Sequence, residues 1–190
     1  MSRFSRISGL LRGHLAAVVG GAAALVFVGA AAPAEQDRFA LSAPNGVSFG
    51  EFRSYQDWAP VAVSQVPDGI KVIAANPVMI AAYRAGIPGN GKPFPDGSAI
   101  VKIEWSQKKD SESPYPVTVP DALKSVSFIE KDSKRFAHTG GWGYAQFQHD
   151  PATGAFKPFG KDASFAQTVC FKCHTAVTAK DYIFTAYPKR

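Results

Sequence analysis

The fold class is decided by residues 61–75, Val-Ala-Val-Ser-Gln-Val-Pro-Asp-Gly-Ile-Lys-Val-Ile-Ala-Ala. β-branched residues are frequent on both sides of Pro67-Asp68-Gly69, a pattern typical of strands, and Pro-Asp-Gly is typical of a tight turn. The stretch therefore predicts two strands, 61–66 and 69–75, joined as a hairpin.

Further elements follow along the chain. We expect strands at 98–106, 126–130 and 143–148, because short runs rich in β-branched and aromatic residues are bounded there by turn residues. Asn76 is expected to cap a short helix that has Pro77 at its first position and continues over 78–85. Residues 162–180 also have helical composition. Strands and helices do not alternate regularly, so the sequence predicts one α+β domain built on an antiparallel β-sheet with a few helices.

The expected strand 98–106 has two different faces. Alternation along it places Ala99, Val101, Ile103 and Trp105 on one face, and Ile100, Lys102 and Glu104 on the other. The following stretch, Lys108–Pro120, is charged and contains proline, so we expect it to form a surface loop.

The first residues have the pattern of a secretory signal. Arg3, Arg6 and Arg12 precede an apolar run over 15–32. The run leads into Ala32-Pro33-Ala34, an A-x-A cleavage motif. We expect residues 1–34 to be removed and the mature protein to begin at Glu35 in the periplasm. An uncleaved membrane anchor is the alternative, because the apolar run is close to the shortest length that spans a bilayer. Residues 35–54 are expected to form an N-terminal arm with a short helix near 49–55, followed by the main domain at 55–190.

Composition limits the function classes. The 190 residues are 46% hydrophobic and 12% aromatic, which is ordinary for a globular protein. Loss of residues 1–34 removes three arginines and no acidic residue, so the formal net charge falls from +6 to +3, with 18 Lys and Arg against 15 Asp and Glu. Such a mild excess does not indicate nucleic-acid binding.

The chain has only two cysteines, and both belong to one motif, Cys170-Phe-Lys-Cys173-His174. C-x-x-C-H is the attachment signature of a c-type haem, in which two thiols bond the vinyl groups and the adjacent histidine binds the iron. A thioredoxin-like pair would open a helix after an early strand, and a zinc site would need further ligands nearby. We therefore predict one covalent haem c, held by Cys170 and Cys173, with His174 as the iron ligand.

The other side of the iron decides what such a haem does. Met79, His138 and His149 are the candidate sixth ligands, but Met79 lies in an apolar helix and both histidines lie at expected turns. We therefore expect a five-coordinate iron. We also expect the second ring nitrogen of His174 to have a hydrogen-bond acceptor that fixes its tautomer.

Five segments carry a resemblance to a known family. They are Pro93-Phe-Pro-Asp-Gly97 leading into Val101-Lys102, Lys131-Asp-Ser-Lys-Arg-Phe136, Gly140-Gly-Trp-Gly-Tyr144, the haem motif, and Asp181-Tyr-Ile-Phe-Thr185. In this order they make residues 55–187 similar to the cytochrome P-460 family, which includes exported monohaem proteins that oxidise hydroxylamine and nitric oxide, and to its relative cytochrome c prime-beta.

The resemblance implies an antiparallel β-sheet homodimer with the haem near a C-terminal helix. It also implies that Lys102 matches the lysine that is bonded to a haem meso carbon in the catalytic members, although a solvated lysine beside Glu104 is the ordinary interpretation of that residue alone. The implied activity is that of an oxidoreductase acting on hydroxylamine or nitric oxide, with a soluble electron acceptor such as another cytochrome.

Two alternatives remain open at this point. One is a nitric oxide binding protein of the cytochrome c prime-beta kind, with a pocket lined by aromatic residues, for which Phe94, Trp105, Phe128 and Trp142 are candidates. The other is a simple electron-transfer cytochrome, in which Met79 or a histidine closes the site.

Overall fold

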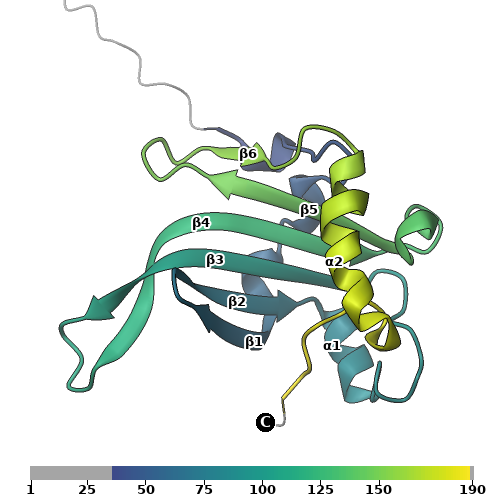
Figure 1. Ribbon diagram of the computed structural model, residues 1–190, viewed down its shortest axis with the longest axis horizontal. Coiled ribbons are helices and arrows are strands. Elements are labelled where there is room, and N and C mark those ends of the chain that lie inside the picture. Colours follow the sequence, from purple (N-terminus) through teal and green to yellow (C-terminus); the bar gives the residue numbers. More distant parts are fainter. Residues whose placement is uncertain (1–35, 189–190) are drawn as a thin grey trace, which may run out of the picture. The chain divides into compact units, whose positions relative to one another are not determined.

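A computed structural model of the chain describes residues 36–188 (Figure 1). The predicted signal segment 1–34 lies outside the described residues. The main feature is a six-stranded antiparallel sheet whose strands lie side by side in chain order. They are β1 (Ala59–Val66), β2 (Gly69–Ala75), β3 (Ala99–Asp110), β4 (Val117–Lys131), β5 (Trp142–His149) and β6 (Phe156–Pro158). The predicted α+β class and antiparallel sheet are confirmed, and β6 is an additional short strand.

Helix α1 (Pro77–Arg84) follows β2 and begins where the sequence predicts. The side chain of Asn76 accepts a hydrogen bond from the Met79 amide at 3.0 Å, and proline occupies the first helical position. The same Asn76 oxygen accepts from the amide of Ala99 at 3.1 Å, so this cap also ties the helix to the start of β3.

One face of the sheet is covered by the segment that precedes β1. This segment contains the short 3-10 helices η1 (Arg38–Ala40), η2 (Phe49–Phe52) and η3 (Tyr55–Asp57). Phe49 is fully buried, and its ring lies 5.1 Å from that of Phe128 and 4.8 Å from that of Phe147. The expected N-terminal arm therefore contributes core residues, Ala43, Val47, Phe49 and Phe52, on the same sheet face as Val101.

The opposite face carries α1 and a helical segment near the C-terminus (Figure 1). That segment has wide, π-helical turns in η5 (Ala166–Phe171), a short α-helical turn in α2 (Lys172–His174) and tighter 3-10 turns in η6 (Thr175–Lys180). Within the described part of the chain, no helix is both long enough and apolar enough to cross a membrane.

The surface loop expected at Lys108–Pro120 is shorter than predicted and covers only residues 111–116. β3 and β4 continue as a paired hairpin, with Lys108 opposite Val119 and Asp110 opposite Val117. The two arms satisfy each other's backbone groups, so this extension needs no buried side chains to be ordered. Polar composition alone therefore did not exclude strand structure there.

Candidate functional site

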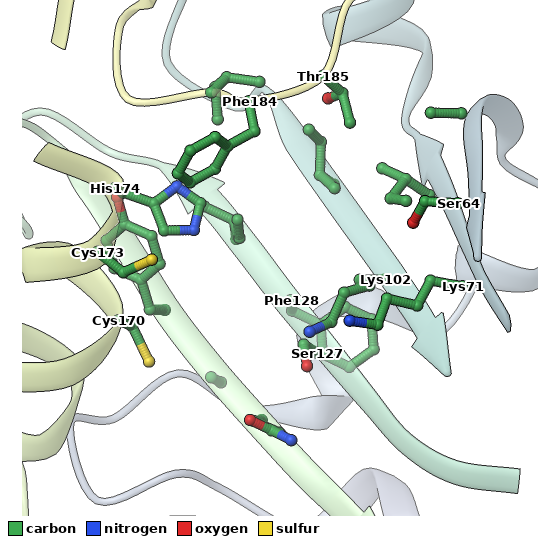
Figure 2. Close-up of a pocket in the computed structure, with 18 of the residues that line it drawn as sticks. Ser64, Lys71, Lys102, Ser127, Phe128, Cys170, Cys173, His174, Phe184 and Thr185 are labelled. Atoms are coloured by element: carbon green, nitrogen blue, oxygen red, sulfur yellow. The ribbon is translucent and has the colours of Figure 1, made fainter. Parts of the chain in front are cut away.

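A cavity of about 530 Å³ lies between the sheet and the C-terminal helical segment (Figure 2). Its volume is within the usual range of cofactor sites. It is lined from the sheet by residues of β1 to β5, from the helical segment by Val169, Cys170, Cys173 and His174, and from the last residues by Ile183, Phe184 and Thr185. Lys102 is among the sheet residues. The four site residues named from the sequence thus line one pocket.

The two cysteines lie one helical turn apart in this segment. Residues i, i+3 and i+4 share a side of a helix, so Cys170, Cys173 and His174 are presented together. Both thiols are free. Burial raises the pKa of the Cys170 thiol, an effect that the nearby Lys102 opposes.

The orientation of the His174 ring is fixed by a hydrogen bond from Nδ1 to a backbone carbonyl. Its Nδ1 lies 2.6 Å from the carbonyl oxygen of Tyr182, and because a carbonyl only accepts, Nδ1 carries the proton. Burial lowers the pKa of the imidazole, the Tyr182 bond raises it and Lys102 lowers it. The ring is therefore favoured in its neutral form, with the Nε2 lone pair free to bind a metal. This confirms the predicted acceptor and identifies it as Tyr182.

Lys102 enters the pocket from the sheet. On β3 it lies opposite Ile73 of β2 and Ser127 of β4, and both neighbours also line the cavity. Figure 2 shows its amine, with that of Lys71, directed into the space that Cys170 borders from the other side. The face of β3 that carries Lys102 therefore borders the cavity.

Glu104 follows on the same face without making it a solvent face. Its carboxylate is 3.7 Å from the Lys102 amine and 3.8 Å from that of Lys124, and its side chain is only 16% exposed. Two cations therefore compensate this partly buried carboxylate.

Two buried hydroxyls in the pocket lack a protein partner. The Tyr144 hydroxyl and Ser127 Oγ have no hydrogen-bond partner among the described residues, and both residues line the cavity. Burial raises the pKa of Tyr144, so its hydroxyl stays protonated. Unpaired buried polar groups are costly and often mark a place that a ligand fills. Sequence reasoning missed both residues, although alternation along β5 places Tyr144 and Gln146 on one face.

The four aromatic residues considered for the nitric oxide alternative are mostly core residues rather than pocket lining. Of the four residues considered, only Phe128 borders the cavity, and its ring is stacked on Phe52 in the opposite core. Phe94 and Trp142 are buried against each other with ring centroids 6.0 Å apart. Trp105 shares the face of Val101, away from Lys102.

None of the candidate sixth ligands lines the pocket. Met79 is a fully buried core residue of α1. The Nδ1 atom of His149 lies 3.1 Å from the Leu123 carbonyl, and His138 borders a different, smaller cavity. The structure therefore keeps these three residues apart from His174.

Comparison with protein families agrees with this geometry. The family model described as Cytochrome P460 matches residues 52–185, which is most of the chain. The chain belongs to the cytochrome P460 family. A search of curated proteins finds no significant match. As a member of this family it is a c-type cytochrome with a haem iron.

The residues present fit this cofactor. A haem c needs two thiols and an axial nitrogen on one wall of a roomy, mainly apolar pocket, and Cys170, Cys173 and His174 supply them in this cytochrome P460. Polar partners for the edge or ligands of the haem are available in Lys71, Lys102 and the unpaired hydroxyls.

Proposed function

We propose that the protein is an exported cytochrome P460 that carries one covalent haem and oxidises hydroxylamine, nitric oxide or both. Periplasmic location is supported by the arginine-flanked apolar segment that ends in Ala32-Pro33-Ala34. A single haem is supported by the single C-x-x-C-H motif. A homodimer is proposed from the family resemblance.

Three residues would hold the cofactor. Cys170 and Cys173 would form thioethers with its vinyl groups, and Nε2 of His174 would bind the iron. The bound haem supplies an iron that accepts electrons and a ligand position for a small nitrogen compound. Met79, His138 and His149 do not line the pocket, which supports an open position opposite His174.

The observation that carries the catalytic proposal is the orientation of Lys102. An amine can bond to a macrocycle only if it is held against the edge, and the Lys102 amine is directed from β3 into the pocket shared with both cysteines. The catalytic members of the family have a lysine bonded to the haem at the matching position. The electrons of the substrate would pass to a soluble acceptor such as another cytochrome, and its protons to solvent.

A second candidate is supported by the chemistry of the lining. Among the described residues that line the cavity, none is a carboxylate that could take protons from hydroxylamine. Glu104 lies behind Lys102 and is already paired with two cations. This favours a protein that binds nitric oxide with little chemistry, in the manner of cytochrome c prime-beta.

One variant pair separates the candidates. We expect Lys102→Ala to move the Soret band to shorter wavelength and to abolish hydroxylamine-dependent reduction of an artificial acceptor, because the lysine bond is lost. Lys124→Ala is the matched control, since Lys124 contacts the same Glu104 and is similarly exposed, at 38% against 36%, but does not line the cavity. The control should retain both properties.

Two outcomes would decide against the catalytic proposal. Identical spectra and rates in Lys102→Ala and the unchanged protein would remove Lys102 from the mechanism. Tight nitric oxide binding without turnover in the unchanged protein would put the binding function first.

A further inference from the structure

A buried ion pair lies behind His174, outside the cavity. The amine of Lys131 is 2.9 Å and 3.1 Å from the two carboxylate oxygens of Asp181, and the side chains are 7% and 11% exposed. The two residues come from the end of β4 and from the turn after η6. Buried charges are expensive unless they are fully paired, so this pair needs further partners.

The structure supplies those partners. The Lys131 amine also donates to the Gly140 carbonyl at 2.9 Å and lies 4.8 Å from the centroid of the Trp142 ring. One Asp181 oxygen accepts from the Phe94 amide at 2.8 Å. The pair is therefore the centre of a network that joins three distant parts of the sequence, at Phe94, at 131–142 and at Asp181.

The network holds an unfavourable backbone turn. Asp181 and Tyr182 have φ values of 49° and 65°, a left-handed conformation that residues with a Cβ rarely adopt. Such a conformation persists only where the surroundings impose it. Here Asp181 is fixed by Lys131 and Phe94, and the Tyr182 ring packs so closely on Gly140 that a Cβ there would collide with it.

The turn at Asp181 and Tyr182 contacts His174, the proposed iron ligand. The carbonyl of Tyr182 is the group that accepts the hydrogen bond from Nδ1 of His174 at 2.6 Å. The direction of this carbonyl depends on the backbone angles that the ion pair holds. A hydrogen bond at Nδ1 makes the imidazole a stronger donor through Nε2, so its geometry tunes whatever metal Nε2 binds.

We infer that Lys131 and Asp181 are positioning residues that aim the Tyr182 carbonyl at His174 and thereby set the reduction potential of the haem. The inference rests on the ligand role of His174 in the proposed function, but not on the hydroxylamine chemistry or on Lys102.

The network also accounts for residues of the family segments that do not line the haem pocket. Phe94, Lys131, Gly140 and Asp181 belong to four of the five segments that carry the family resemblance, and all four meet at this pair. Their common task is to support the proximal histidine.

The test compares variants at the pair with a matched control nearby. Asp181→Asn removes the charge that holds Lys131. Asp96→Asn is the control, because Asp96 joins the segments of Phe94 and Lys131 by accepting from Ser133 at 2.9 Å and 2.7 Å. No hydrogen bond or ion pair links Asp96 to the turn at Asp181 among the described residues. The measurements are the haem reduction potential and the iron–histidine stretching frequency of the ferrous protein by resonance Raman spectroscopy.

We expect Asp181→Asn to raise the potential by roughly a tenfold change in the ratio of reduced to oxidised haem, which is about 59 mV for one electron. The reason is that a weaker hydrogen bond makes His174 a weaker donor to ferric iron. The stretching frequency should fall, and the control should change neither value. A shift in both with hydroxylamine oxidation absent would support the inference while contradicting the proposed function.

Because Asp181→Asn leaves the buried Lys131 charge without a counter-ion and could prevent folding, the double variant Lys131→Met with Asp181→Asn is measured as well. It removes both charges, which buried pairs tolerate better than the loss of one. A folded double variant should show the same shifts. Unchanged potential and frequency in the folded variants, equal shifts in the Asp96→Asn control, or failure of the double variant to fold would each overturn the inference.

Discussion

For His174, the sequence predicts the role of the side chain but does not identify its hydrogen-bond partner. Its role as a ligand is predicted from Cys170, Cys173 and its own position in a local motif. The partner of its second nitrogen is a backbone carbonyl, that of Tyr182, and a carbonyl carries no sequence signature. The sequence could therefore predict that an acceptor exists but could not identify it.

The predicted absence of a second protein ligand to the iron can be tested by single substitutions. Met79→Leu, His138→Gln and His149→Gln should each leave the visible spectrum of the ferric protein high-spin, because none of these side chains lines the pocket. Met79→Leu keeps the side-chain volume in the core, so we expect it to cost less than about 1.5 kcal/mol of unfolding free energy. A low-spin protein that one of these changes makes high-spin would instead be an electron-transfer cytochrome.

The strands show which parts of the fold are encoded locally. Alternation along residues 98–106 correctly separated the face of Val101 from that of Lys102, because side-chain direction in a strand depends only on position. Which face would border the pocket was not encoded there. It depends on contacts distant in the sequence, with Phe49 covering one face and the C-terminal helical segment covering the other.

Contacts between elements also predict how stability depends on pH. Burial first, and then the neighbouring Glu51, raise the pKa of Glu130 on β4 from 4.5 to about 7, although Arg135 lies 3.0 Å away and opposes the shift. The folded state therefore binds this proton more tightly than the unfolded state does. The stabilisation is complete below pH 4.5 and is lost as the pH rises through about 7.

We expect the free energy of unfolding to fall by on the order of 1–2 kcal/mol between pH 5 and pH 8, because each unit of pKa shift corresponds to roughly 1.4 kcal/mol and solvent screens part of this effect at a carboxyl group that is not fully buried. Glu130→Gln should flatten this dependence, because it removes the titrating group and keeps the shape. Denaturant unfolding of both proteins across this pH range measures the difference. The same slope in the variant would assign the pH dependence to other groups.

At the scale of the whole molecule, the N-terminal end of the described domain is joined to the sheet by Gln36, the second residue after the predicted signal. The side-chain Nε2 of Gln36 donates to the Phe156 carbonyl at 2.8 Å, and its side-chain Oε1 accepts from the Phe156 backbone amide at 2.6 Å. Gln36 therefore continues the pairing of the sheet edge at β6. Cleavage before Glu35 would leave this anchor intact, so the domain boundary proposed from the sequence is compatible with a complete fold.

Cleavage after Ala32-Pro33-Ala34 can be tested by the location and the mass of the protein. We expect the protein in the periplasmic fraction of the expressing cell, with the denatured mass of residues 35–190 plus one haem, because signal peptidase removes the segment and thioethers survive denaturation. The matched control is a variant with leucine in place of Ala32 and Ala34. This change should block cleavage and retain the chain in the membrane fraction. Unchanged protein that keeps residues 1–34 in the membrane fraction would make this segment an anchor, and a mass without haem would contradict covalent attachment.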